Sequence, residues 1–354
     1  MKKGLDIPLA GVPDLAVKRT VLPDIVAVQP SDFKGLNPRL LVREGDRVLA
    51  GSPVLADKKN PDILVTSPVS GIVKEVVRGD KRKLLAVLVK ADEEQESLDF
   101  SAPKDGLTAD VVKETLLKSG LWAAFIQRPY GIVADPAATP KAIYVSAFSI
   151  APLAADTEFT LGSKVAELQA GVSALAKLAP VHVSVKSADS AFAKFSDATV
   201  HVVKGKHPAG NVGVQIAAVS PIRKDETVLT ISLALLAAVG RLFTTGRYDV
   251  RRTVAVGGPA TNGPAYINTL PGIPMTALKE YYVHPEGVRI ISGDVLTGRN
   301  AGEGGYLGFY DTQVTLIKEG TEPELLGWAR PFRFNQYSAD HTYFNWCLGL
   351  MDKE

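Results

Sequence analysis

Residues 42–73, VREGDRVLAGSPVLADKKNPDILVTSPVSGIV, decide the fold of the N-terminal part of the sequence. Short runs rich in β-forming residues, such as RVLAG and ILV, alternate with turn signals made of Gly, Asp, Asn and Pro. The same alternation extends over about residues 39–89 and is typical of a small all-β sandwich or barrel. The sequence therefore predicts a β-domain near the N-terminus.

The two halves of this stretch, E-G-D-x-V-x-x-G-x-x-L and S-P-x-S-G-x-V, resemble the two faces of a biotinyl- or lipoyl-type domain. That resemblance predicts a barrel-sandwich fold and raises the question of a carrier lysine. Lys59 lies nine residues before Pro68 and Lys58 lies ten before it, a longer spacing than a carrier hairpin has, and Pro61 would reshape the turn. Solvated turn lysines are favoured. A carrier protein bearing biotin or lipoate on one of the two lysines stays as an alternative.

The composition is that of a soluble globular protein of two or three domains. Of 354 residues, 46% are hydrophobic and 22% charged, with 40 Lys and Arg against 38 Asp and Glu, so no nucleic-acid partner is expected. The single cysteine, Cys347, excludes an internal disulfide or an iron–sulfur cluster built from this chain alone. The N-terminus lacks the apolar core of a secretory signal. The longest apolar run, residues 227–239, is too short to span a bilayer, so no transmembrane segment is expected.

Beyond an acidic linker after residue 90, the pattern changes to alternating helix and strand. Thr108 is a good N-cap for a helix over 108–119, and Gly120 is a good stop signal. Residues 141–146 and 181–185 predict buried strands, and 160–179 carries a helical pattern between them. This order predicts a parallel pair with a right-handed crossover.

A third region begins near residue 253. Its order of a strand, a short helix that starts at PGIP, and further strands predicts a small αβ module. The chain is thus expected to be an α/β multi-domain protein. Its predicted parts are an N-terminal barrel-sandwich domain at 1–100, an α/β domain at 101–252, the small module at 253–330 and an aromatic tail at 331–354.

No motif for independent catalysis, dinucleotide binding or metal binding is evident. The glycine-rich stretches at 257–259 and 302–305 do not match G-x-G-x-x-G between a strand and a helix. The five histidines show no metal-ligand spacing. His182 and His201 are in strand-like runs and are expected to be structural, whereas His207 lies in the shaped loop GKHPAGN and is a better binding candidate. No catalytic residue, cofactor-binding residue or metal ligand is therefore predicted.

Several stretches together resemble one family, the A subunits of the bacterial Na⁺-translocating NADH:quinone reductase. They occur in family order over nearly the whole chain and are KKGLDIPLAGVP (2–13), SGLWAAFIQRPY (119–130), IYVSAFSIAPLAAD (143–156), LQAGVSAL (168–175), GKHPAGNVGVQI (205–216), VAVGGPA (254–260), ISGDVLTGR (291–299) and FYDTQVTLIKEG (309–320). The resemblance implies a Rossmann-like α/β domain related to the flavin subunit of complex I and to the C subunit of the Rnf complex. It also implies that the third region is a β-grasp module of the soluble-ligand-binding (SLBB) type.

The same resemblance implies a peripheral subunit on the cytoplasmic side of the bacterial inner membrane. The complex of six subunits would use NADH, flavins, iron centres and quinone to export Na⁺, and this chain would not be catalytic alone. Where related proteins carry a glycine-rich flavin loop, residues 120–129 read GLWAAFIQRP, whose side chains would block a phosphate. No cofactor is therefore expected on this chain. A stand-alone flavin-dependent NADH oxidoreductase remains a second alternative.

The family is linked with quinone binding, and a quinone head needs an apolar slot with one or two hydrogen-bond donors. The candidates for such a slot are Arg128, Tyr130, Phe148, Asp156 and His207, because they come from the ends of the predicted α/β elements. Each has a structural alternative. Arg128 and Asp156 would form an ion pair, Tyr130 and Phe148 would be core residues, and His207 would be a turn residue.

Two departures from the family pattern stand out. The loop that usually continues G-T-H-I reads Gly213–Ile216, GVQI, so Gln215 replaces a second histidine. The family chain also continues past the aromatic tail, which predicts that residues 331–354 are the start of a truncated C-terminal region.

Overall fold

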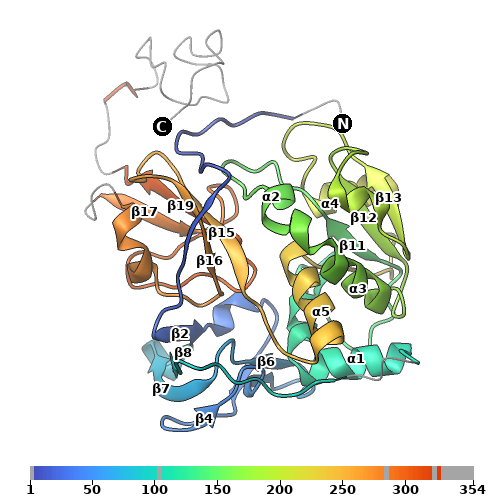
Figure 1. The fold of residues 1–354 in the computed structure, drawn as a ribbon, viewed down its shortest axis with the longest axis horizontal. Helices are drawn as coiled ribbons and strands as arrows, with labels where there is room; N and C mark the ends of the chain where they lie inside the picture. The colour runs from blue at the N-terminus through green and yellow to red at the C-terminus, as the bar shows by residue number, and fades with distance from the viewer. Residues whose placement is uncertain (1–3, 102–105, 283–286, 321–324, 328–354) are drawn as a thin grey trace.

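The structure is a computed structural model, and it describes residues 4–101, 106–282, 287–320 and 325–327. The predicted aromatic tail at 331–354 lies outside these residues. Three sheet-based parts are packed together, with the β-domain at the bottom, the α/β domain at the right and the third module at the left of Figure 1. Within the described residues, no helix combines the length and the apolar character that a membrane span requires.

The N-terminal β-domain consists of a four-stranded and a three-stranded sheet, which confirms the barrel-sandwich prediction. The first sheet has the order β2 (Ile25–Val28), β8 (Leu84–Ala91), β7 (Gly71–Arg78) and β4 (Arg47–Val48). The second has the order β3 (Pro38–Leu40), β5 (Pro53–Asp57) and β6 (Leu64–Thr66). Alternating Val and Leu side chains fill the space between them, with Val26, Val54 and Val87 fully buried.

Lys58 and Lys59 are exposed in the turn between β5 and β6. Asp57 fixes this turn, because its carboxylate accepts hydrogen bonds from the backbone amides of Asn37 (2.9 Å) and Asn60 (3.3 Å). The turn is therefore a rigid, solvated corner of the domain.

The α/β domain begins with α1 (Ala109–Lys118), as predicted. The Thr108 hydroxyl caps its first turn by accepting from the amide of Val111 (3.3 Å), and Gly120 ends it in the left-handed region at φ +78°. Its six-stranded sheet has the order β10 (Ile132–Val133), β9 (Ile126–Arg128), β14 (Val228–Thr230), β11 (Ile143–Ser146), β12 (Val181–Val185) and β13 (Ala198–Val202). β14, β11, β12 and β13 are parallel, and β9 and β10 are antiparallel additions at one side.

The helical pattern predicted over 160–179 is divided in the structure. It contains α2 (Thr157–Leu161), a 3-10 turn (Gly162–Lys164) and α3 (Val165–Leu175). α3 packs closely on α5 (Leu233–Thr245), where a side chain at Gly240 would meet the carbonyl of Glu167 at 1.7 Å. The apolar run at 227–239 is likewise divided, because it supplies β14 and the buried first half of α5.

Chain order gives the sheet a reversal point. From β11 the chain crosses through α2 and α3 to β12 and β13, and then returns through α4 (Val212–Val219) to β14 on the other side of β11. The strand order therefore reverses at β11, with β12 and β13 on one side of it and β14 on the other. In open α/β sheets this is the position of a ligand crevice.

The third module is a mixed six-stranded sheet with the order β1 (Val17–Thr20), β16 (Ala265–Thr269), β15 (Arg252–Gly257), β19 (Gln313–Lys318), β17 (Val288–Ser292) and β18 (Arg299–Asn300). The short helix predicted after PGIP is a 3-10 helix, Met275–Tyr281.

The N-terminal segment through β1 does not pair with the sheets of the β-domain, although the sequence predicted it as part of that domain. β1 pairs in parallel with β16, so the first strand of the chain is an edge of the third sheet. Residues 4–16, here called the N-terminal strap, run from the α/β domain to that sheet along the top of Figure 1. The strap is held by a hydrogen bond from the amide of Leu5 to the carbonyl of His207 (2.9 Å) and by one from the amide of Gly258 to the carbonyl of Gly11 (3.0 Å).

Candidate functional site

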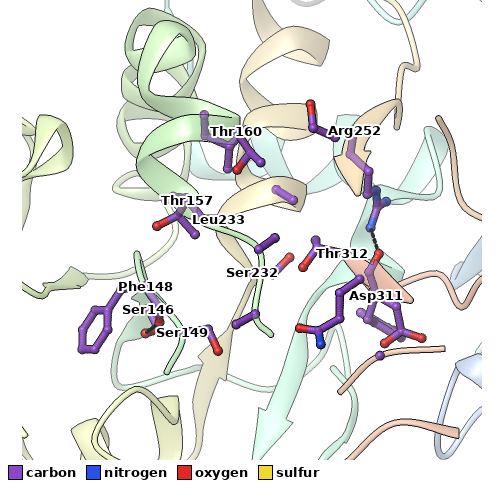
Figure 2. Close-up of a pocket in the computed structure, with 18 of the residues that line it drawn as sticks. Ser146, Phe148, Ser149, Thr157, Thr160, Ser232, Leu233, Arg252, Asp311 and Thr312 are labelled. Atoms are coloured by element: carbon purple, nitrogen blue, oxygen red, sulfur yellow. Dashed lines mark hydrogen bonds between the residues drawn. The ribbon is translucent and has the colours of Figure 1, made fainter. Parts of the chain in front are cut away.

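A cleft of about 220 Å³ lies at the reversal point of the α/β sheet. One wall comes from the carboxyl end of β11 and from α2, the back from the start of α5, and the other wall from the third module. Figure 2 shows Phe148 and Ser149 on one side and Arg252 and Asp311 on the other, with Ser232 and Thr312 between them. The cleft thus joins two domains at the position where the topology predicts a ligand.

Serine and threonine side chains dominate the polar lining of the cleft. They are Ser146, Ser149, Thr157, Thr160, Ser232, Thr253 and Thr312. Four of them are already within hydrogen-bond distance of acceptors: Ser146 of Phe148 O and Gly210 O, Thr157 of Ala147 O, Thr160 of Asp156 O, and Thr253 of Asn268 Oδ1.

The other three hydroxyls donate no hydrogen bond to another described residue. Ser149 and Ser232 accept from the amides of Ala151 and Leu235 (both 3.3 Å), which occupies a lone pair and leaves each O–H free to donate. Thr312 has no side-chain hydrogen bond among the described residues. These three donors line the same cleft as the apolar side chains of Phe148 and Leu233.

Arg252 is the positive charge of the cleft. It is 4% exposed, and its guanidinium donates to the carbonyls of Phe309 (2.8 Å) and Val250 (3.3 Å). Burial lowers the pKa of Arg252 to about 10, which leaves it protonated at neutral pH. Burial raises the pKa of Asp311, although the hydrogen bond from the Ser292 hydroxyl (2.5 Å) opposes that rise.

Gln215 supports the β11 wall from behind. It is 1% exposed, and its Nε2 donates to Ser146 Oγ (2.9 Å) and to the carbonyl of Ala209 (3.1 Å). Its Oε1 is buried and has no partner among the described residues. The Gln215 amide therefore joins the 203–211 loop to the end of β11.

Of the five predicted quinone residues, one lines the cleft and one lies at its border. Phe148 is 8% exposed and forms part of the wall. Asp156 lies between Ala155 and Thr157, which both line the cleft, and its carboxylate caps α2 by accepting from the amide of Phe159 (3.0 Å). No ion pair joins Asp156 to Arg128 within the described residues, so that structural alternative is wrong.

Arg128 and Tyr130 are at the opposite edge of the sheet. β9 is antiparallel to β14 and pairs Arg128 with Val228, the first residue of β14, so the end of β9 meets the amino end of the parallel strands. Tyr130 is 75% exposed there, which also excludes the alternative that it is a core residue. The structure does not bring these two side chains to the cleft.

His207 does not line the cleft either. It lies in the 203–211 loop, where a cis peptide bond precedes Pro208 and the Nδ1 atom is buried without a partner among the described residues. The strap covers this loop through the Leu5 hydrogen bond and an ion pair between Asp6 and Lys206 (2.7 Å). The loop reaches the cleft only indirectly, through the contact between Gly210 O and Ser146 Oγ.

Residues 120–125, for which the resemblance predicted blocked flavin binding, are tightly packed. Trp122 and Phe125 are 4% and 0% exposed, with ring centroids 5.5 Å apart. The indole of Trp122 donates to the carbonyl of Ala134 (2.9 Å), and the Tyr310 hydroxyl donates to the carbonyl of Ala123 (2.6 Å). The segment is therefore packed by its own side chains and tied to the third module by the Tyr310 hydrogen bond.

His182 and His201 form a pair across two neighbouring strands. His182 Nδ1 is 2.9 Å from His201 Nε2, and Tyr144 stacks on His182 with a centroid distance of 4.8 Å. Burial and the neighbouring imidazole lower the pKa of His182. The described residues contain no group of three or more side chains that could hold a metal ion.

Comparison with known proteins gives consistent matches along the chain. Family models match the NqrA N-terminal barrel-sandwich hybrid domain at residues 1–92, the NqrA second alpha/beta domain at 107–248 and the NQRA C-terminal domain at 253–303.

Curated relatives match over nearly the full sequence. The chain is 37% identical to the A subunit of the Na(+)-translocating NADH-quinone reductase of Vibrio vulnificus over 349 residues, which are 97% of this chain and 78% of that protein. The corresponding protein of Actinobacillus succinogenes is 36% identical over 347 residues, 97% of this chain and 78% of the relative. That of Pseudomonas aeruginosa is 35% identical over 336 residues, 93% and 75%. The chain therefore belongs to the family of Na(+)-translocating NADH-quinone reductase A subunits.

Proposed function

We propose that this chain acts as the A subunit of a Na⁺-translocating NADH:quinone reductase. Its similarity to named A subunits covers nearly its whole length, and all three family domains are present in order. The chain would be one of six subunits and would attach peripherally to the complex on the cytoplasmic side of the bacterial inner membrane. Its enzymatic role would be that of a part of an oxidoreductase.

We further propose that the cleft receives the head of a quinone. The observation that carries this proposal is the set of three free donors, Ser149, Ser232 and Thr312, in an interdomain cleft that apolar side chains also line. A quinone ring offers two carbonyl acceptors and a flat apolar body, which match such a slot. The volume of about 220 Å³ is below that of common cofactor pockets and suits one ring rather than a dinucleotide.

We also infer that NADH, flavin and iron centres belong to other subunits of the complex. The packing of Trp122 and Phe125 supports this inference for flavin, because a phosphate needs backbone amides that no side chain covers. The buried positive charge of Arg252 would favour extra electron density on a quinone oxygen in the cleft.

Membership of the complex is tested by purifying a tagged form of this chain from native membranes in mild detergent. Co-purification of integral subunits with Na⁺-stimulated NADH:quinone reduction is expected. A chain that elutes alone, while the activity stays in the membranes, would overturn the proposal.

The quinone site needs its own test, because this chain could belong to the complex without touching quinone. A short-chain quinone with a photoreactive tail is irradiated with the purified complex, and the labelled peptides are mapped by mass spectrometry. Labelling within 146–161, 232–234 or 310–313 that unlabelled quinone suppresses is expected. Competable labelling confined to other subunits would place the head group elsewhere.

A further inference from the structure

We propose that a groove on the N-terminal β-domain binds an acidic segment of a partner protein that also carries apolar side chains. The groove has a volume of about 670 Å³ and lies between β3 and the end of the β7–β8 hairpin. It is formed by the β-domain alone, outside the lining of the cleft, and so does not depend on the proposed quinone site.

The charge of the groove is of one sign. Its five charged lining residues are Arg39, Lys58, Arg78, Arg82 and Lys83, and no acidic residue lines it. All five are exposed, and within the described part of the chain none is within 4 Å of a carboxylate. On a chain with 40 basic and 38 acidic residues, this concentration of unpaired cations is local and not a consequence of overall charge.

The floor of the groove is apolar. Leu36, Leu40 and Leu84 are half-buried and pack on the core of the domain, and Phe33 beneath them is 3% exposed. Leu85 at the rim is 44% exposed. A ligand that fits this groove therefore needs negative charge at the sides and apolar groups at the base.

The backbone fixes the cationic rim in place. In the hairpin turn, the amide of Gly79 donates to the carbonyl of Lys83 (2.9 Å), and the amide of Arg82 donates to the carbonyl of Gly79 (3.1 Å). Arg82 adopts φ +60°, a left-handed conformation that glycine or asparagine adopts at lower cost. Lys58 is fixed across the groove, because its amide donates to the carbonyl of Asn37 (2.8 Å). A preorganised rim lowers the entropic cost of binding.

Shape decides among anionic partners. A bilayer surface is flat and would touch the protruding lysines and arginines without reaching the recessed floor. Single-stranded nucleic acid needs exposed aromatic faces for base stacking, and Phe33, the one aromatic residue of the lining, is buried. A polypeptide with Asp or Glu next to Leu, Ile or Val reaches both the rim and the floor.

The test uses the full chain and a fluorescein-labelled peptide of alternating Glu and Leu, measured by fluorescence anisotropy. Two control peptides carry Lys in place of Glu or Ser in place of Leu, and both are expected to bind at least about tenfold more weakly. The double variant Lys58→Glu, Arg82→Glu should weaken binding of the Glu–Leu peptide by about tenfold or more. The matched control Lys74→Glu, Lys90→Glu makes the same charge change on exposed residues of this domain outside the groove, and it should change binding by less than about twofold.

Three outcomes would overturn the proposal. The first is no binding of the Glu–Leu peptide at low salt. The second is an equal loss in both double variants, which would show that only net charge matters. The third is binding of phosphatidylglycerol vesicles that Lys58→Glu, Arg82→Glu abolishes while the peptide does not bind, which would assign the groove to a membrane surface. Unchanged circular dichroism and thermal midpoints of both variants verify that each is folded.

Discussion

Residues 120–125 lie within the α/β domain, and the cleft at the ends of β11 and β14 lies between that domain and the third module; the first region is filled and the second is open. Trp122 and Phe125 fill the first region and hydrogen bonds tie it to its surroundings, whereas small hydroxyl residues leave space in the second. The contrast shows that side chains can close one stretch of backbone in a domain while small residues leave a cleft at the reversal point of its sheet.

The strongest test of the filled region is Trp122→Ala. Removal of a buried indole leaves a cavity and loses the hydrogen bond to Ala134, so stability should fall by about 3–5 kcal/mol. Chemical denaturation measures this change. Tyr130→Ala is the control, because this nearby aromatic is 75% exposed and its removal should cost less than about 0.5 kcal/mol. Equal losses in the two variants would contradict a packed role for Trp122.

The open region is tested by filling it with Ala154→Phe. Ala154 lines the cleft and is half-buried, so the added ring should occupy the ligand's space and weaken binding of a short-chain quinone by at least about tenfold. Isothermal titration calorimetry on the purified complex gives the affinity. Ala137→Phe places the same ring on an exposed loop that precedes β11 and should leave the affinity unchanged. If Ala154→Phe binds quinone normally, the cleft is not the quinone position.

A smaller effect is expected from Thr312→Val, which removes one free donor and keeps the side-chain shape. The loss of one neutral hydrogen bond corresponds to about 1 kcal/mol, or about fivefold in quinone affinity. Thr157→Val is the control, because that hydroxyl already donates to Ala147 O and is not free to donate to a ligand. A loss of quinone affinity for Thr157→Val alone would contradict the assignment of donors.

The smallest expected effect concerns the contact between the β-domain and the third module. Asp32 of the β-domain pairs with Arg299 of the third module (3.0 Å), and burial, which outweighs this arginine, raises the pKa of Asp32 to about 6. The folded state therefore binds this proton more tightly than the unfolded state does. The resulting stability is complete below about pH 4 and is lost as the pH rises through about 6.

Between pH 7 and pH 5, this carboxyl should add about 1 kcal/mol to the stability of the wild type relative to Asp32→Asn. Denaturation of both proteins at each pH isolates the contribution from other titrating groups, including His182. Parallel pH dependences would show that Asp32 is not the responsible group.

Much of the fold could be predicted because its signals are local. The Thr108 cap, the Gly120 stop and the alternating strands of residues 39–89 each depend on neighbours in sequence. The pairing of β1 with β16 could not be predicted, since Val17 and Tyr266 are brought together only by the folded chain.

The site was harder to predict for the same reason. Phe148 could be predicted from the sequence, because it lies shortly after a recognisable parallel strand. Ser232 could have been predicted as the N-cap of α5. Arg128 was misplaced because nothing local shows that β9 runs antiparallel to its neighbour. Arg252 and Thr312 line the cleft only because the third module packs against the α/β domain. The periodicity of the sequence does not predict that packing.

The parallel pairing of β1 with β16 also has a consequence during synthesis. Val17 leaves the ribosome long before Tyr266, and translation at roughly 5–20 residues per second separates the two by about 10–50 s. During this interval the β-domain and the α/β domain can fold, while the first strand of the chain still lacks the sheet that it will join. A strand that is made early is thus placed late, and nascent chains released before residue 269 should expose it to proteases and chaperones.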